Sequence, residues 1–170
     1  MIGAIQIQKT DDAAAILTAA LGVLSGAGLR VGGAIQTSRP PTVDAFDCDM
    51  HLSIIGEDAA PVRISQSLGP GSTACRLDTG ALAACCARVM RQLHDGCDAL
   101  ILNKFGKVEA AGGGLRDAFA LGASLGVPVL TTVAPDQRAV FLAFAGDLAT
   151  LLKPSEVPAW CHAACFGRVA

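Results

Sequence analysis

The sequence predicts an α/β fold of three layers, in which a mostly parallel sheet carries helices on both faces. Short apolar runs alternate with longer amphipathic segments along the chain, which is typical of consecutive strand–helix units. The run ALIL at 99–102 is apolar at every position, as expected for a strand buried on both faces of a parallel sheet. The length of 170 residues suits one hydrophobic core, and no internal repeat is visible, so we expect a single domain over 1–170.

The first half of the chain predicts two strands around a helix, followed by an irregular insert. We expect strands at 2–8 and 29–36, and between them a helix that Asp11 or Asp12 caps and that runs to about Ser25. The runs at 48–55 and 61–68 flank the turn GEDAA, and their spacing predicts an antiparallel hairpin. The segments 38–46 and 69–78 are expected to be loops, since they are rich in proline, glycine and small polar residues.

The second half returns to regular alternation. A helix is expected at 79–94, with Asp78 or Thr79 as its cap. A strand at 97–103, a helix at 115–125, a last strand at 127–133 and a short helix from Pro135 follow. The remainder, 147–170, is expected to form a terminal helix and tail.

Composition excludes several classes of partner. The net charge of −2 gives no electrostatic reason to expect nucleic acid or an anionic membrane as the partner. The uncharged stretch 13–29 places its large residues on one helical stripe, which predicts a buried amphipathic helix rather than a membrane span or a signal peptide. Seven cysteines without a CxxC pair indicate a reduced, cytoplasmic protein. Helix faces rich in alanine and glycine are compatible with a homo-oligomer.

The loop after the first strand resembles a phosphate-binding loop only in part. Lys9 and Thr10 stand where the Lys-Ser/Thr pair of such a loop would stand, but the glycine-rich stretch before them is missing. Asp11 and Asp12 would also repel phosphate from the start of the helix. A plain helix cap is the alternative interpretation.

The loop at 68–78 offers groups that could hold a small anion. Glycines at 69 and 71 permit a nest of backbone N–H groups, and hydroxyls and a guanidinium lie close by in the sequence. The candidate ligand-binding residues here are Gly71, Ser72, Thr73 and Arg76. The alternative is a surface turn that precedes a capped helix.

The segment 103–114 is the most unusual candidate site. Ligands of parallel α/β sheets bind beyond the carboxyl ends of the strands, and an amide, two lysines and a carboxylate follow a buried strand here. The three glycines at 112–114 let the backbone approach a ligand. The candidates are Asn103, Lys104, Lys107, Glu109, Gly112 and Gly114. The alternative is a salt-bridged turn and a loose helix start.

A metal or thiol site is a weaker candidate. Asp47, Cys48 and Asp49 are contiguous, and Cys75 could meet Cys48 in space, while alternation would place His51 on the same strand face as Asp49. Cys161 and Cys165 are spaced i, i+4, which is more typical of a packed helix face than of a ligand pair.

Four segments make the chain resemble a known family. CDMHLSII, ISQSLGPGSTACRLD, DALILNKFGKVEAAGGGLRDA and GVPVLTTV, in this order, are similar to the bacterial proteins grouped as domain of unknown function 2478. More distantly, the chain resembles the small P-loop nucleoside triphosphatases of the thermophile-type NTPase family, which implies a P-loop NTPase-like fold. RVGGAIQT is similar to their second strand, and NKFGKVE lines up with their acidic motif DEIGKME. This alignment puts Asn103 in place of the magnesium-linked Asp and Lys104 in place of the Glu that would orient water.

The departures from that pattern predict a binding module rather than an efficient NTPase. Phosphoryl transfer needs a phosphate cradle, a metal and a group that positions water, and all three are altered here. Lys104 and Asn103 could instead bind a nucleotide, or an oxyanion such as molybdate or phosphate, without magnesium. The family is associated with molybdenum uptake and use, so the resemblance implies that a compound related to pterin nucleotides is a further candidate ligand.

Two alternative functions remain open. One is an unconventional nucleoside triphosphatase in which Asp47, Asp49 or Glu109 replaces the lost acids. The other is a thiol-based sensor or metal-handling protein that uses Cys48 and Cys75.

Overall fold

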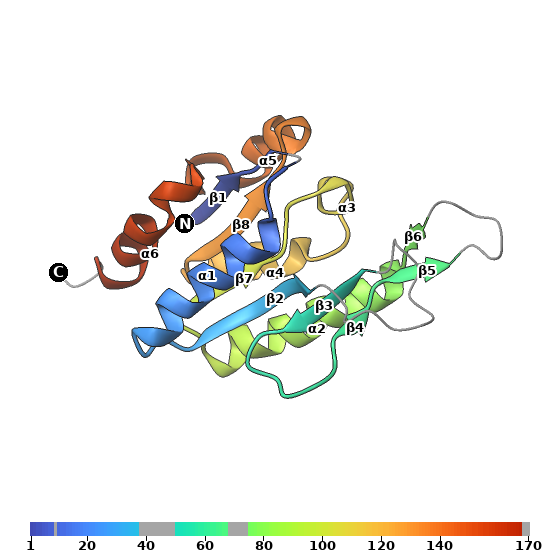
Figure 1. Ribbon diagram of the computed structural model, residues 1–170. Coiled ribbons are helices and arrows are strands. Elements are labelled where there is room, and N and C mark those ends of the chain that lie inside the picture. Colours follow the sequence, from blue (N-terminus) through green and yellow to red (C-terminus); the bar gives the residue numbers. More distant parts are fainter. Residues whose placement is uncertain (9, 38–49, 68–74, 168–170) are drawn as a thin grey trace.

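A mixed sheet with the strand order β4-β3-β2-β7-β8-β1-β9 forms the middle layer of the protein (Figure 1). The computed structural model describes residues 1–8, 10–37, 50–67 and 75–167, without the side chains of Ser67, Cys75 and Arg76. The parallel part consists of β1 (Ile2–Gln6), β2 (Val31–Thr37), β7 (Ala99–Leu102), β8 (Val129–Val133) and β9 (Ala149–Leu152). β3 (His51–Ile54) and β4 (Val62–Arg63) extend it in antiparallel fashion beside β2.

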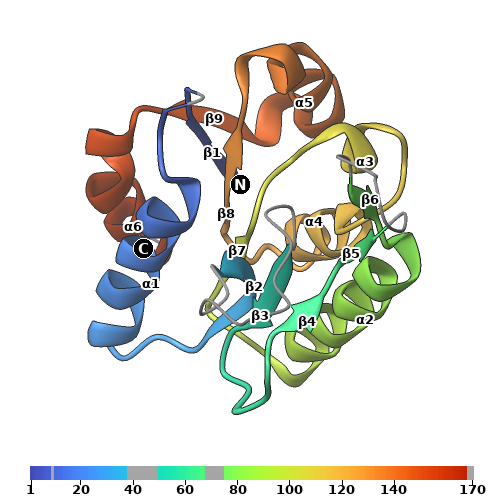
Figure 2. The ribbon, with the colours of Figure 1, turned by 45° about the vertical axis from the view of Figure 1, so that its right-hand side comes forward.

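Helices cover both faces of the sheet, which confirms the predicted three-layer α/β architecture (Figure 2). On one face, α1 (Ala13–Gly26) and α6 (Val157–Phe166) enclose a hydrophobic cluster that includes Ile5, Ile35, Ile101 and Leu130. On the other face lie α2 (Thr79–Asp95), α3 (Lys107–Ala110), α4 (Arg116–Ser124) and α5 (Arg138–Ala145). Short 3₁₀ turns at Pro135–Gln137, Gly146–Leu148 and Pro154–Glu156 complete the connections.

The first helix forms where its cap and its apolar stripe predict it. The side chain of Asp12 accepts a hydrogen bond from the backbone N–H of Ala15 at 3.0 Å, and Leu17, Ala20 and Leu24 are buried one turn apart. The helix has 14 residues. In the described parts of the chain, no helix combines the length and the apolar character that a membrane crossing requires.

Two strands lie where the sequence predicted other structure. Cys75–Leu77, predicted as part of a loop, forms β6 and pairs antiparallel with β5 (Ser65–Ser67) in a small second sheet. Residues 149–152, predicted to belong to a terminal helix, form β9 and pair with β1. Tertiary pairing decides the conformation of such short segments, because three or four residues are too few to display a period.

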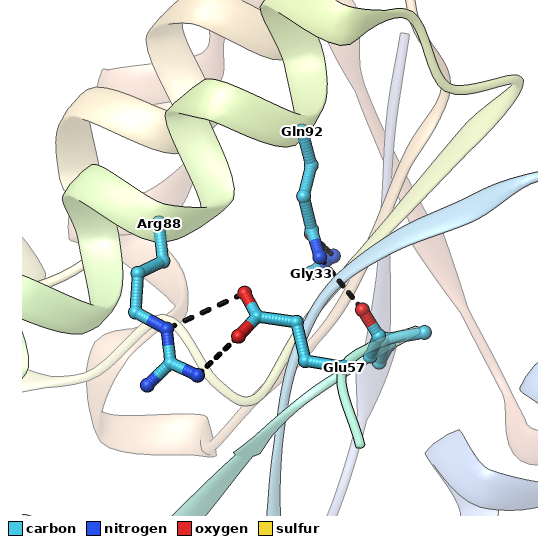
Figure 3. Close-up of polar contacts among 5 residues, drawn as sticks. Gly33, Glu57, Arg88 and Gln92 are labelled. Carbon is cyan, nitrogen blue, oxygen red and sulfur yellow. Dashed lines mark hydrogen bonds and ion pairs between the residues drawn. The ribbon is translucent and has the colours of Figure 1, made fainter. Parts of the chain in front are cut away.

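The turn between β3 and β4 is fastened to α2 by three side chains (Figure 3). Gln92 accepts the backbone N–H of Gly33 at 2.9 Å and donates to the carbonyl of Ile55 at 2.7 Å, so it bridges β2 and the end of β3. Arg88 pairs with both carboxylate oxygens of Glu57 and lowers the pKa of that carboxyl group. The antiparallel insert is therefore held in a fixed position against the parallel sheet.

Candidate functional site

A pocket of about 390 Å³ opens where the parallel strands end. Ile7, Gln36, Asn103 and Ala134 come from the carboxyl ends of β1, β2, β7 and β8, and all four line it. This is the edge at which open parallel sheets bind their ligands. The remaining lining residues are Met50, Leu52, Ile64, Leu77, Leu82, Lys104, Phe105, Gly106, Lys107, Val108, Glu109, Leu115, Asp136 and Gln137.

Asn103 is a fixed part of the pocket wall, with 7% of its surface exposed. β7 stops at Leu102, and the side chain of Asn103 continues the pairing with β2, because its Oδ1 accepts the backbone N–H of Gln36 at 3.1 Å. Its Nδ2 donates to the Oε1 of Gln36 at 3.3 Å, and its carbonyl accepts the hydroxyl of Thr132 at 2.9 Å. Neighbouring strands on both sides thus hold this residue in place.

Lys104 supplies an exposed cation beside that amide. Its stem lies along Gly106, where Cε comes within 3.8 Å of the position that a Cβ would take. Within the described parts of the chain, Lys104 makes no hydrogen bond and no ion pair. Lys107 begins α3 and lines the same pocket. Both cations stand at the carboxyl edge of the sheet, where the sequence places them.

Glu109 is buried and organises the backbone around it. Its Oε2 accepts the N–H of Gly106 at 3.0 Å and its Oε1 accepts the N–H of Leu115 at 3.1 Å, so one carboxylate closes the whole segment between them. Gly114 has φ +63°, and a Cβ there would lie 2.1 Å from Oε1. Gly112, at φ +94°, turns the chain in open space. Neither glycine lines the pocket, and Gly114 is required by its close approach to the carboxylate of Glu109.

The start of α1 is satisfied by the protein's own carboxylates. The side chain of Asp11 accepts the backbone N–H of Gln8 at 2.7 Å, in addition to the cap that Asp12 forms. Thr10 is exposed and does not line the pocket, and Lys9 lies outside the described residues. Thr10 is therefore not part of the pocket that Lys104 borders.

Most of the other candidate residues lie outside the part of the chain that the structure describes. They fall into two groups, which are Gly71, Ser72 and Thr73 from the loop at 68–78, and Asp47, Cys48 and Asp49 from the candidate metal site. Arg76 and Cys75 belong to β6, the strand whose Leu77 lines the pocket. Among the described side chains, no three His, Cys, Asp or Glu residues cluster closely enough to hold a metal ion.

Most described thiols are packed inside the protein. Burial raises the pKa values of Cys85 and Cys86, and it raises the pKa of Cys161 to about 11. Cys161 belongs to the core beneath α6, in agreement with the packed helix face that its spacing predicted.

Sequence reasoning missed Gln36 and the apolar wall of the pocket. Gln36 ends an ordinary strand pattern and carries no motif. Met50, Leu52, Ile64 and Leu82 resemble core residues in the sequence, and only the packing of the insert against α2 brings them to the pocket. The structural role of Glu109 did have a signal, since the spacing G-x-x-E is that of a helix capping box.

Comparison with known proteins shows a family and a similar protein. The family described as "Protein of unknown function (DUF2478)" matches residues 2–160. The chain is also similar to the protein named "Molybdenum import ATP-binding protein ModC 2" of Bradyrhizobium diazoefficiens, at 33% identity over 162 residues. The alignment covers 94% of this chain but 18% of the relative, so the chain spans less than a fifth of that protein's length. No solved structure matches the chain.

Proposed function

The chain belongs to the DUF2478 family, and from that premise we propose that it is a binding module in which Lys104 holds a nucleotide or an oxyanion at the carboxyl edge of the sheet. The observation that carries the proposal is the exposed ammonium group of Lys104, which has no partner among the described residues and borders a pocket of about 390 Å³. An ammonium group beside amide donors is suited to an oxyanion.

The same geometry argues against efficient hydrolysis. Metal-assisted phosphoryl transfer needs carboxylates that can hold magnesium and a group that orients water. Asn103 provides an amide at the strand end, and both oxygens of Glu109 already accept backbone hydrogen bonds. Asp11 and Asp12 occupy backbone donors around the start of α1 that a phosphate loop would leave open.

The name of the relative supports a connection with molybdenum or with ATP. Its name is that of an ATP-binding protein of molybdenum import, and the aligned region includes nearly all of this chain. Molybdate and nucleotides are therefore the first ligands to test. We propose a small anionic ligand of this kind as the binding partner of the chain. Binding of molybdate or of ATP would each correspond to one part of the relative's name.

Isothermal titration calorimetry with ATP, GTP, molybdate, tungstate and phosphate tests the proposal. At least one of them should bind, and Lys104→Ala should weaken it by about tenfold or more, the effect of losing a charge-assisted hydrogen bond. Lys153→Ala is the matched control, because Lys153 is also exposed, follows a strand and does not line the pocket.

Phosphate release in the presence of magnesium, measured on the same samples, separates binding from hydrolysis. A flat time course alongside measurable binding agrees with a binding module. Turnover that Glu109→Gln abolishes while circular dichroism shows the variant to be folded would instead favour the unconventional triphosphatase. If neither these five ligands nor a nucleoside monophosphate produces heat, or if Lys104→Ala binds as the parent does, the proposed function is wrong.

A further inference from the structure

We propose that the ligand of this pocket is a small organic anion, a heteroaromatic ring system with one singly or doubly charged group, rather than a bare oxyanion or a triphosphate. The inference rests on the proposed function, because it takes Lys104 as the group that meets the charge. Three properties of the pocket lead to it: its size, its apolar wall and its balance of charges.

The pocket is too large for an inorganic oxyanion alone. Four oxygens, each with about the 30 Å³ of a water molecule, fill on the order of 100 Å³. The pocket has about 390 Å³, which lies near the lower end of the range for sites that bind organic ligands. A bare molybdate or phosphate ion would leave most of this volume to water.

One wall of the pocket consists of apolar side chains, which provide no charge and no hydrogen bond for an inorganic ion. Leu52, Ile64, Leu82 and Leu115 line it and are each at most 5% exposed, so they belong to the hydrophobic core. Met50 lies at the same wall and is partly exposed. Binding against this wall is favourable only for a ligand with apolar surface of its own, and a polarisable thioether suits a ring face.

The polar side of the pocket has a free hydrogen-bond donor among the described residues, so the apolar part of the ligand should carry an acceptor atom. The Oε1 of Gln36 accepts from Asn103, which leaves its Nε2 as a donor directed by that pairing. No described residue accepts from this Nε2. A hydrocarbon body would bury the donor without a partner, whereas a ring nitrogen or a ring carbonyl would satisfy it.

The charges around the pocket disfavour a triphosphate. Lys104 and Lys107 are the cations of the described lining, and Glu109 and Asp136 are its carboxylates, so two positive charges face two negative ones. A ligand with three or four negative charges would exceed the two cations of the described lining, while a ligand with one or two would be met by Lys104, which has no partner among the described residues.

Calorimetry with adenosine 5′-monophosphate, guanosine 5′-monophosphate, adenosine, ribose 5-phosphate, ATP and molybdate tests the inference. We expect a nucleoside monophosphate to bind at least tenfold more tightly than ribose 5-phosphate, which lacks the ring, and than adenosine, which lacks the charge. Met50→Gln, which keeps the length of the side chain, should weaken the monophosphate about fivefold and leave molybdate unchanged. Met90→Gln, a half-buried methionine of α2 outside the pocket, is the control.

The outcomes separate this inference from the proposed function. If molybdate binds in a Lys104-dependent manner, and the monophosphates bind no better and ignore Met50→Gln, the inference is wrong while the proposed function stands. ATP binding tighter than the monophosphates would overturn the inference in the same way. If no probe binds, or if Lys104→Ala changes nothing, the proposed function fails and the inference fails with it.

Discussion

Asn103 makes two hydrogen bonds to a single residue of the neighbouring strand: its Oδ1 accepts the backbone N–H of Gln36, and its Nδ2 donates to the side-chain Oε1 of Gln36. The donor half of this arrangement uses the amide of Asn103, and a carboxylate at position 103 would have no proton for Oε1 unless the Gln36 amide turned to present its Nε2. Asn103, which the resemblance to the small NTPases aligns with a magnesium-linked acid, is therefore fastened to the edge of the sheet.

Asn103→Asp should destabilise the protein by about 1–3 kcal/mol, since it places a charged carboxylate at a buried position and removes the donor to Gln36 Oε1, so that the Gln36 amide has to turn. It should also weaken anion binding, because it adds a negative charge beside Lys104. Urea unfolding and calorimetry measure the two effects. Gln8→Glu, at an exposed residue whose side-chain amide makes no hydrogen bond within the described parts of the chain, is the control for stability. Unchanged stability would mean that the amide pair contributes nothing.

Glu109→Gln should cost about 1–3 kcal/mol of folding free energy, because an amide can accept only one of the two backbone hydrogen bonds that the buried carboxylate accepts. Glu156→Gln is the matched control, since Glu156 accepts the backbone N–H of Lys153 at 2.7 Å in an exposed position. It should cost clearly less. Equal losses in urea unfolding would argue against a special structural role for Glu109.

Gly33→Ala should be strongly destabilising, by about 3 kcal/mol or more, because Gly33 has φ +123° and a Cβ would lie 1.9 Å from the carbonyl oxygen of Ile101. Gly56→Ala provides the comparison: φ is +77° there, but no atom lies within 4 Å of the added Cβ. It should show only the backbone strain of about 1 kcal/mol. Thermal unfolding of the two variants tests whether steric contact or conformation dominates.

The ion pair between Arg88 and Glu57 should stabilise the protein at neutral pH and fail in acid. The hydrogen bond from Arg88 lowers the pKa of Glu57 below its ordinary 4.5, so the folded state holds the charged form more strongly than the unfolded state does. Its contribution is complete above pH 4.5 and is lost as the pH falls through the lower folded value. In Glu57→Gln, the melting temperature should fall less steeply as the pH is lowered below 4.5. Asp58→Asn, at the exposed neighbouring residue, is the control and should change this dependence less.

Native-state alkylation should leave Cys85, Cys86 and Cys161 unmodified longest, because burial raises the pKa of each thiol and little thiolate forms near neutral pH. The thiol-sensor hypothesis adds that Cys48 and Cys75 react first. Mass spectrometry of a time course, with a urea-unfolded sample as reference, ranks the seven thiols. Equal rates for all seven would remove that hypothesis, and fast labelling of Cys161 would contradict the packing of α6.

The sequence predicted the layers well because those depend on periodicity and caps. Asp12 and Asp78 cap their helices as expected, and the apolar run at 99–102 is buried throughout. The strands Cys75–Leu77 and Ala149–Leu152 were not predicted, because pairing with another strand gives these short segments their conformation, and for Ala149–Leu152 that partner lies at the other end of the sequence. At the site, the lysines at the sheet edge could be identified from spacing, but the partnership of Asn103 with Gln36 depends on a register that no local pattern specifies.

The aspartates at the start of α1 also constrain how this scaffold could be re-engineered. Inserting glycines before Thr10 would not by itself create a phosphate cradle, because the side chain of Asp11 would still compete for the N–H of Gln8. Replacing Asp12 as well would remove a cap and cost about 1 kcal/mol before any phosphate bound. Engineering triphosphate chemistry into this scaffold would thus require several coordinated substitutions, and the first ones would weaken the protein.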